Sequence, residues 1–478
     1  MSEENKNKNN PFIINEDDIF KNDKLKRKDA IENLSHLIVS TKEAFTLSIN
    51  ADWGAGKTTF VKLWQAHLKK EHQVNSIYFS AWEDDFSKEP LISILGEINN
   101  YIEDNFKDKS DTAQNFEKVK EFGGKVLRRG IPAFVKGATA GVLDIDKGFE
   151  SAIGALTEET AKELINKYSK DKEITLSFKD AIQQLLKNIS SEKPFVIFID
   201  ELDRCRPLYA IELLERVKHI FGIDGLIFVL SIDKKQLSES IKSQYGNIDA
   251  NSYLKRFIDL EYNLTNSNVD EFCDNLYYSV YELDKVLTSK EIKKEYGKYN
   301  ELAMLKYLTK SMNLNLREIE QIFIQINIIF KTINPRLFEI HFRVIVFFIV
   351  LKLKDSKLYD ELINKRKSVE EILTIIFQNI VKDDSYGDVY KYIKIIIKAI
   401  TLATSKTDNE MNLVIEQQNE ILNVMSDREE KSQHNQLIKI LRLGENDAMY
   451  RLNKAIETVI KKIEFVDKFN FDGIKESS

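Results

Sequence analysis

Residues 45–68 constrain the fold of this chain more than any other segment, because a strand pattern, a glycine turn and a helix pattern follow one another there. Phe45, Leu47 and Ile49 alternate with polar residues, as expected of a β-strand. The turn that comes next contains Gly54 and Gly56. After the turn, apolar residues recur at the spacing of one helix face, at Phe60, Leu63, Trp64 and Leu68. This order predicts a loop whose backbone N–H groups surround an anion at the amino end of a helix.

The turn fits the phosphate-loop pattern G-x-x-x-x-G-K-[ST] at every position but the first, where Ala51 replaces glycine. Lys57 would reach the outer phosphates of a nucleotide, and the hydroxyl of Thr58 would ligate Mg²⁺. Ala51 would cost energy if its position required a positive φ. We predict a nucleotide phosphate site, with a purely structural glycine turn as the alternative. The predicted phosphate-binding residues are Trp53, Gly54, Ala55, Gly56, Lys57, Thr58 and Thr59.

A second candidate site follows residues 195–199, which are apolar throughout, as expected of a central parallel strand that is covered on both faces. The run ends in an acidic cluster at residues 200–204. Asp200 would share Mg²⁺ with the phosphate loop, and Glu201 would polarise the attacking water, with Asp203 in reserve. A solvated acidic turn is the alternative. The phosphate loop upstream favours the catalytic interpretation, because hydrolysis of a bound triphosphate needs both a metal and an acid.

The composition limits the classes of protein that fit. The 478 residues are enough for two or three domains, and a net charge of −6 argues against a strongly basic nucleic-acid binder while leaving a local basic groove open. The two cysteines, Cys205 and Cys273, have neither metal spacing nor a disulfide framework, so a cytoplasmic location is expected. The polar first residues do not form a signal peptide. The apolar run at residues 344–351 is far shorter than the ~20 residues of a membrane span, so we predict a core helix and no transmembrane segment.

Further strand patterns occur at residues 76–81, 226–232 and 259–264, and they alternate with helix patterns. Such alternation predicts an α/β fold with a parallel sheet sandwiched by helices and with ligands at the carboxyl ends of the strands. Neighbouring parallel strands need only one crossover helix, yet more than a hundred residues separate the second strand from the strand that ends in the acidic cluster. A helical insertion at about residues 88–193 is therefore expected between the phosphate loop and the acidic cluster.

The predicted domains are a disordered polar tail at residues 1–20, a nucleotide-binding core at 21–265 and an all-α region at 266–478. A helix is expected at residues 23–40, ahead of the first strand. Within the insertion, residues 123–154 are rich in Gly and Ala and are expected to be loosely ordered. The polar segment at residues 405–434 predicts either a solvated helix pair or a flexible arm.

These motifs resemble those of the KAP family of P-loop NTPases, which includes membrane-associated scaffold proteins and bacterial phage-exclusion and defence proteins. The resemblance covers roughly residues 23–326 and rests on several blocks in a fixed order. The blocks are residues 23–27 (DKLKR), 53–58 (WGAGKT), 79–82 (FSAW), 198–205 (FIDELDRC), 228–233 (FVLSID) and 253–257 (YLKRF). The tryptophan in the phosphate loop and the LDRC after the first acids make the match fairly specific.

The resemblance implies a Mg²⁺-dependent nucleoside triphosphatase, with ATP as the expected nucleotide and a protein partner from a bacterial defence module. The phosphate loop is then the Walker A motif and the acidic cluster the Walker B motif. The resemblance also implies that the sensor strand, residues 226–232, lies between the Walker A and Walker B strands. Many KAP members carry paired transmembrane helices between the two motifs. Here Lys136 and Asp144 bracket the most suitable run, which indicates a member without these helices.

Residues outside the two main motifs receive further roles from the resemblance. Asp233 or Ser231, at the tip of the sensor strand, would sense the γ-phosphate, although Asp233 could instead cap the helix that follows. Arg256 would act as an arginine finger on the nucleotide of a neighbouring copy, which predicts a homo-oligomer. The alternative for Arg256 is an ordinary basic residue on the surface.

Two other arginines and one tryptophan are weaker candidates. Arg317 would be a second sensor or, as the simpler alternative, an arginine on a helix surface. Arg204 is expected to brace Asp200 or Asp203 rather than to touch phosphate. Trp82 would support the site from the second strand or belong to the core.

Three functions are compatible with these motifs. The leading hypothesis is an ATPase that couples hydrolysis to oligomerisation or to remodelling of a partner. The second is an ATP-binding switch or scaffold with little turnover, which the replacement at Ala51 favours. The third is a nucleic-acid-acting ATPase, which a lysine cluster at residues 125–136 favours and the negative net charge opposes.

Overall fold

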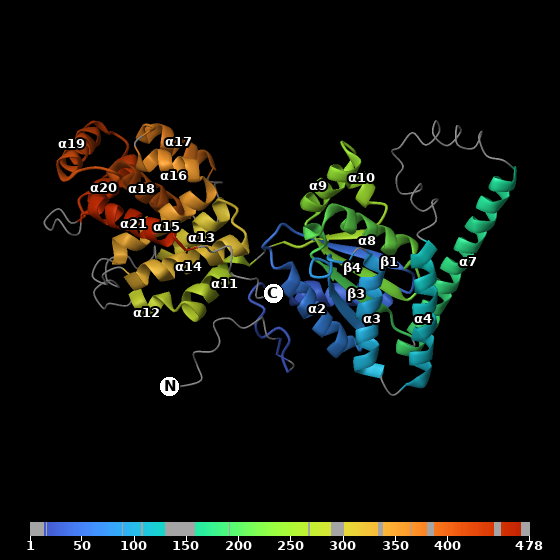
Figure 1. The fold of residues 1–478 in the computed structure, drawn as a ribbon. Helices are drawn as coiled ribbons and strands as arrows, with labels where there is room; N and C mark the ends of the chain where they lie inside the picture. The colour runs from blue at the N-terminus through green and yellow to red at the C-terminus, as the bar shows by residue number, and fades with distance from the viewer. Residues whose placement is uncertain are drawn as a thin grey trace. The chain divides into compact units, whose positions relative to one another are not determined.

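The computed structural model describes residues 14–15, 17–87, 89–106, 109–129, 158–190, 192–265, 268–287, 301–332, 338–364, 366–379, 387–443 and 451–469. The chain forms two compact units that divide between Thr265 and Asn266 (Figure 1). Among the described residues, the first unit contains a β-sheet with helices, and the second contains helices joined by turns.

The first unit is built on a parallel sheet with the strand order β2-β3-β4-β1-β5 among the described residues. The strands are β1 (Phe45–Asn50), β2 (Ser76–Ser80), β3 (Phe195–Asp200), β4 (Leu226–Ile232) and β5 (Leu260–Asn263). β4 lies between β1, which leads into the phosphate loop, and β3, which leads into the acidic cluster. The predicted α/β fold is therefore confirmed, and so is the place of the sensor strand.

Helices cover both faces of this sheet, as predicted. The described helices of the first unit are α1 (Lys28–Ser40), α2 (Lys57–His72), α3 (Pro90–Phe106), α4 (Ser110–Arg129), α7 (Glu158–Ile189), α8 (Pro207–His219), α9 (Lys234–Tyr245) and α10 (Ala250–Leu254). Val196 and Phe198 of β3 enter a core shared with α1 and α2, whereas Ile197 and Ile199 enter a core shared with α3, α8 and α9. Successive side chains of one strand point to opposite faces, so the whole apolar run is buried.

The helical insertion lies between β2 and β3 and includes α3, α4 and α7. α4 and α7 lie side by side and pack against each other (Figure 1). Gly123 of α4 permits this close packing, since a Cβ there would lie 2.9 Å from the side chain of Leu95 and 3.3 Å from the ring of Phe178. Residues 130–157, which hold most of the stretch that was expected to be loosely ordered, lie outside the described residues.

The helix before the first strand begins at Lys28, five residues later than predicted. The carboxylate of Asp23 explains the delay, because it accepts the backbone N–H groups of Leu25 at 3.2 Å and of Arg27 at 2.6 Å. Lys26 has a φ of 50°, in the left-handed region that a right-handed helix does not use. Side-chain bonds to the local backbone compete with helix formation, and here they hold residues 23–27 in a turn.

The described helices of the second unit are α11 (Val269–Asp274), α12 (Leu283–Leu287), α13 (Glu301–Ser311), α14 (Leu316–Thr332), α15 (Phe338–Lys354), α16 (Ser356–Ile363), α17 (Val369–Asn379), α18 (Gly387–Ala403), α19 (Asp408–Val424), α20 (Arg428–Leu441) and α21 (Leu452–Val466). A π-helical turn, Asn275–Val280, follows α11. α15 is the core helix predicted for residues 344–351, all of which are buried. No helix that the structure describes combines the length and the apolar character needed to cross a membrane.

The polar segment at residues 405–434 forms a helix pair, which was one of its two predicted forms. Thr407 begins α19 with a capping box, in which its hydroxyl accepts the Glu410 N–H and the Glu410 carboxylate accepts the Thr407 N–H. α20 packs against α19, and the buried ring of His434 hydrogen-bonds the Gln418 carbonyl at 3.0 Å. Local caps and this buried contact order a segment whose composition alone left its structure open.

Candidate nucleotide-phosphate site

The phosphate loop places glycine where its backbone requires glycine. Gly54 has a φ of 77° and Gly56 a φ of 74°, both in the left-handed region that glycine adopts without a steric penalty. Ala51 is not among the residues with positive φ, so alanine causes no backbone strain at the first position of the motif. The departure from the usual pattern therefore gives no reason to expect a distorted loop.

The loop ends at the amino terminus of α2, which starts at Lys57 with Gly56 as its N-cap. Glycine has no side chain to cap the first N–H groups of the helix, and the first turn of α2 contains no acidic residue. These N–H groups and the positive end of the helix dipole are therefore available to an anion. Thr58 and Thr59 follow in the same turn and are half-buried.

The ammonium group of Lys57 folds back onto the loop. Its Nζ donates to the carbonyls of Ala51 at 2.8 Å and Asp52 at 3.3 Å. Burial lowers the pKa of Lys57, and the negative charges of Asp203, Asp233 and Asp200 oppose that shift. All three acids thus lie close enough to act on this ammonium group, so the structure brings the two predicted motifs together at one edge of the sheet.

Asp200 is held in a fixed orientation at the end of β3, where it is 1% exposed. The hydroxyl of Tyr78 on β2 donates to its Oδ2 at 3.1 Å, and the backbone N–H of Glu201 donates to its Oδ1 at 3.0 Å. Burial and the Asp200 charge raise the pKa of Tyr78 well above its usual range, so its hydroxyl remains a donor. Tyr78 was not predicted, although the polar–apolar alternation of the second strand could have pointed to it.

Glu201 occupies a strained backbone position and both of its carboxylate oxygens have partners. Its φ of 61° is uncommon for a residue other than glycine. Nη1 of Arg204 lies 2.9 Å from Oε1, and the hydroxyl of Ser80, at the end of β2, donates to Oε2 at 3.0 Å. Arg204 is expected from the sequence to brace Asp200 or Asp203, and the structure shows it paired with Glu201. Its guanidinium also lies 5.6 Å from the ring of Trp82, which is half exposed rather than part of the core.

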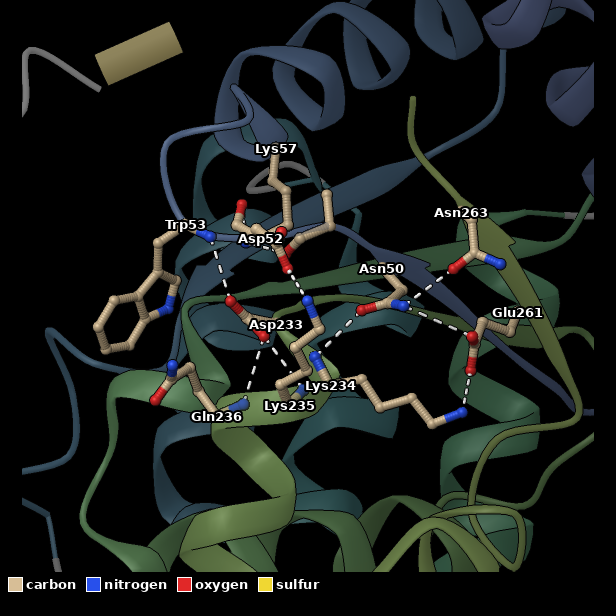
Figure 2. A network of polar contacts seen from close by, with 11 residues as sticks. Asn50, Asp52, Trp53, Lys57, Asp233, Lys234, Lys235, Gln236, Glu261 and Asn263 are labelled. Atoms are coloured by element: carbon tan, nitrogen blue, oxygen red, sulfur yellow. Dashed lines mark hydrogen bonds and ion pairs between the residues drawn. The ribbon is translucent and has the colours of Figure 1, made fainter. Parts of the chain in front are cut away.

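Trp53 connects the phosphate loop to two buried acids. Its backbone N–H donates to Oδ2 of Asp233 at 3.1 Å (Figure 2). Its indole N–H donates to Oδ2 of Asp203 at 2.5 Å. Burial raises the pKa of Asp203, while Lys57 and the Trp53 indole oppose that shift. The tryptophan that distinguishes the WGxGKT block therefore ties the loop to the acidic cluster and to the tip of the sensor strand.

Asp233 caps α9, which is one of its two predicted roles. Its Oδ1 accepts the backbone N–H groups of Lys235 at 3.1 Å and Gln236 at 3.3 Å (Figure 2). Nearby, Oδ1 of Asn50 accepts the Lys234 N–H at 3.1 Å, and its Nδ2 donates to Asn263 at 2.9 Å. The start of the phosphate loop is thus bonded to α9 and to the end of β5.

Arg256 lies in the chain segment that leads to the amino end of β5, whereas the phosphate loop follows the carboxyl end of β1. This arginine belongs to the turn after α10, where its guanidinium lies 5.9 Å from the ring of Tyr253 and its side chain is exposed. Asp259, three residues later, bonds the backbone of Thr46 near the start of β1. The loop begins about five residues further along β1, roughly 16 Å away at the rise of a strand. Arg317 lies on α14 in the second unit and is also exposed.

The residues around Asp200 fit a hydrated divalent cation. Ser231 of β4 is paired in register with Asp200, so both side chains point to the face of the sheet that α2 covers. The Ser231 hydroxyl is fully buried and has no hydrogen-bond partner among the described residues. Buried polar atoms rarely lack a partner, and Mg²⁺ prefers oxygen ligands and keeps several waters. Asp200 and Thr58 are the residues that would hold it.

The parallel sheet, the glycine loop before α2 and the acids at the end of β3 define a P-loop NTPase core. The sequence of residues 27–333 matches the KAP family P-loop domain, and the chain therefore belongs to the KAP family.

Solved structures of the Aeropyrum pernix ORC2 protein are also similar to this chain. The structure of its ADPNP–ADP complexes shares 11% identity over 93% of this chain and 95% of that chain, with a TM-score of 0.31. Its ADP form shares 9% identity over 94% of both chains, with a TM-score of 0.28. No curated protein matches this sequence.

Proposed function

We propose that this KAP-family protein is a Mg²⁺-dependent ATPase. The observation that supports this most is the meeting of the two motifs, since Trp53 of the phosphate loop bonds Asp203 of the acidic cluster and Asp233 at the tip of β4. Residues from Trp53 to Thr59 would bind the phosphates, with Lys57 exchanging the carbonyls of Ala51 and Asp52 for phosphate oxygens. ATP rather than GTP is the nucleotide that the family resemblance favours.

The chemistry would be an in-line attack of water on the γ-phosphate. Mg²⁺, when bound, neutralises charge on the phosphate oxygens, and Thr58 and Asp200 would hold it. Glu201 would orient and polarise the water, with Asp203 as the alternative. Asp233 is fixed at the tip of β4 beside the loop, where it would respond to the γ-phosphate through its bond to Trp53.

The direct test is phosphate release by the full chain in wild type and in Glu201→Gln. We expect the variant to bind ATP but to lose most of its turnover. Glu239→Gln is the matched control, because Glu239 is an exposed acid on α9 that pairs locally with Lys242. Equal rates in wild type and Glu201→Gln would remove Glu201 from the mechanism, and absence of ATP binding by the wild type would remove the proposed function.

Arg256 would serve the site of a neighbouring copy, which makes the working form a homo-oligomer. The support is its place in the chain, because Asp259, three residues later, bonds Thr46 at the start of β1, whereas the phosphate loop follows the end of that strand. An arginine finger contributes about 10³-fold or more to the rate. Arg256→Ala and Lys57→Ala should each be inactive alone and should regain activity when mixed, because one copy supplies the loop and the other the finger. Lys255→Ala is the control, and mixing without recovery would contradict the assignment.

A second candidate function, a nucleotide switch with little turnover until a partner binds, is favoured by the contacts of Glu201. Arg204 and Ser80 occupy both of its carboxylate oxygens. In this hypothesis the two contacts would hold Glu201 away from the attacking water, so a partner that displaces Arg204 would start hydrolysis. In this case Arg204→Met combined with Ser80→Ala should raise the basal rate. A rate that stays equal or falls would favour the constitutive enzyme.

The biological setting rests on the family resemblance. We propose a cytoplasmic protein that acts with a partner from a bacterial defence module, its helical second unit transmitting the nucleotide state to that partner. Plaque counts on cells that express wild type or Lys57→Ala would test this, because only an ATP-dependent defence protein loses protection with the loop lysine. Stimulation of turnover by DNA or RNA at low salt would instead favour the nucleic-acid-acting alternative.

A further inference from the structure

We propose that Arg27 is a positioning residue of the phosphate loop, which sets the orientation of the backbone N–H groups that receive the phosphates. This inference rests on the proposed nucleotide site. The DKLKR block at residues 23–27 is one of the motifs described above. It lies outside the phosphate loop and the acidic cluster, and neither of these gives it a role.

The guanidinium of Arg27 binds two consecutive carbonyls of the loop. Its Nη2 donates to the Ala55 carbonyl at 2.6 Å, and its Nη1 donates to the Gly56 carbonyl at 2.7 Å. The same Gly56 carbonyl accepts the Phe60 N–H at 3.1 Å, which is the first backbone bond of α2. The flat, forked shape of a guanidinium suits two neighbouring acceptors, which the ammonium group of a lysine cannot bind with the same geometry.

These bonds fix the orientation of two peptide groups and therefore the direction of their N–H groups. In a trans peptide the C=O and the following N–H point in opposite directions, and no cis peptide occurs among the described residues. The carbonyl of Ala55 shares its peptide plane with the Gly56 N–H, and the carbonyl of Gly56 shares its plane with the Lys57 N–H. Since Arg27 holds both carbonyls on its own side, both N–H groups are directed to the opposite side, away from the body of α2 and toward the space in front of its amino end.

Arg27 is itself held firmly enough to act in this way. It is only 4% exposed, and its guanidinium lies 5.7 Å from the ring of Phe60. Its backbone N–H donates to Asp23 at 2.6 Å, and the left-handed φ of Lys26 turns the chain just before it. Burial lowers the pKa of Arg27 to about 10, so the group stays charged at neutral pH and adds positive potential behind the loop. A buried cation directly behind an anion site is consistent with a phosphate ligand on the opposite side.

The test is the affinity of the full chain for Mg²⁺-ATP and for Mg²⁺-pyrophosphate, measured by calorimetry in wild type and Arg27→Lys. Pyrophosphate carries no base or sugar, so it reports on the phosphate loop alone. Loss of one charge-assisted hydrogen bond corresponds to a loss of about 10- to 100-fold in affinity, and we expect this factor to be equal for both ligands. The matched control is Arg216→Lys, because Arg216 is also buried and makes two bonds, to Glu89 at 2.7 and 2.8 Å.

The outcomes separate the inference from the proposed function. An unchanged pyrophosphate affinity in folded Arg27→Lys overturns the role of Arg27, as does a loss for ATP alone. A similar loss in Arg216→Lys would also overturn it, because destabilisation would then explain the result. If Arg27→Lys does not fold, Asp23→Asn takes its place, and several-fold weaker pyrophosphate binding is expected. Wild-type protein that binds neither ligand would contradict the nucleotide site itself.

Discussion

Replacement of Asp233 by Asn tests whether the sensor strand holds the phosphate loop in place. The carboxylate of Asp233 is 4% exposed and divides its bonds between two elements. Its Oδ1 caps α9 through the N–H groups of Lys235 and Gln236, and its Oδ2 accepts the N–H of Trp53 in the loop. Asn caps a helix as well as Asp does. An Asn whose oxygen remains on the cap, however, directs its NH₂ group at the Trp53 N–H, so the variant removes the bond to the loop alone.

The expected magnitude follows from these bonds. A hydrogen bond to a charged acceptor contributes about 1.5–3 kcal/mol when it is buried. Asp233→Asn should therefore lower the free energy of unfolding by about 2 kcal/mol. Asp233→Ala also removes the cap and should cost about 1 kcal/mol more. Because the loop of either variant must then be ordered by the nucleotide, we expect ATP affinity to fall by about tenfold.

Tryptophan fluorescence during urea unfolding of the full chain is the appropriate assay. All three tryptophans, Trp53, Trp64 and Trp82, lie in the first unit, so the signal reports on the unit that contains Asp233. Asp249→Asn is the matched control, because Asp249 caps α10 through two backbone N–H groups at 3.1 Å in the same unit. Equal stability losses in Asp233→Asn and Asp249→Asn, together with unchanged ATP affinity, would refute the argument that the Asp233–Trp53 bond orders the loop.

Three further predictions follow from single contacts of the site. Tyr78→Phe removes the hydroxyl that orients Asp200, so Mg²⁺ affinity in the presence of ADP should fall about tenfold, and an unchanged Mg²⁺ titration would show that Tyr78 acts only in packing. Burial raises the pKa of Asp203 above its ordinary 3.8, so the folded protein holds the proton more tightly than the unfolded chain and wild-type stability falls as the pH rises through the folded pKa. Asp203→Asn removes this cost, so its urea midpoint should exceed that of the wild type at pH 7. The difference between the two midpoints should be much smaller at pH 4, and equal differences at both pH values would contradict the assignment. Gly56→Ala places a Cβ at a φ of 74°, which should destabilise the chain by about 1–2 kcal/mol in thermal unfolding, and a neutral effect would mean that the loop changes conformation.

Local sequence patterns were sufficient for the sheet and for the residues that surround the site. Residues 195–199 could be recognised as a central strand because no polar side chain interrupts them, and the structure buries both of their faces. The glycine loop and the acids at 200–204 each follow a strand, and the carboxyl ends of parallel strands meet at one edge. The meeting of Lys57 with Asp200 could therefore be predicted from the sequence alone. The catalytic roles of these residues are still predictions.

Other features could not be predicted because they depend on bonds between distant or irregular segments. Helix α1 starts late because Asp23 and Lys26 form a turn, which apolar periodicity does not reveal. The pairing of Arg204 with Glu201 depends on the left-handed backbone of Glu201 itself. Alanine at position 51 is tolerated because only Gly54 and Gly56 of the loop have a positive φ. The motif pattern alone does not show which of its glycines need that backbone conformation.

The amino-acid sequence by itself determined the class of fold, the order of the motifs and the edge of the sheet at which they meet, because hydrophobic periodicity and glycine placement act over a few neighbouring residues. Only the tertiary structure decided which side chains hold those motifs in place. Arg27 reaches the loop across 28 residues, Tyr78 reaches Asp200 across 122, and Trp53 reaches Asp203 across 150. The three-dimensional packing of the sheet and its helices brings these partners together, and no local sequence pattern predicts them.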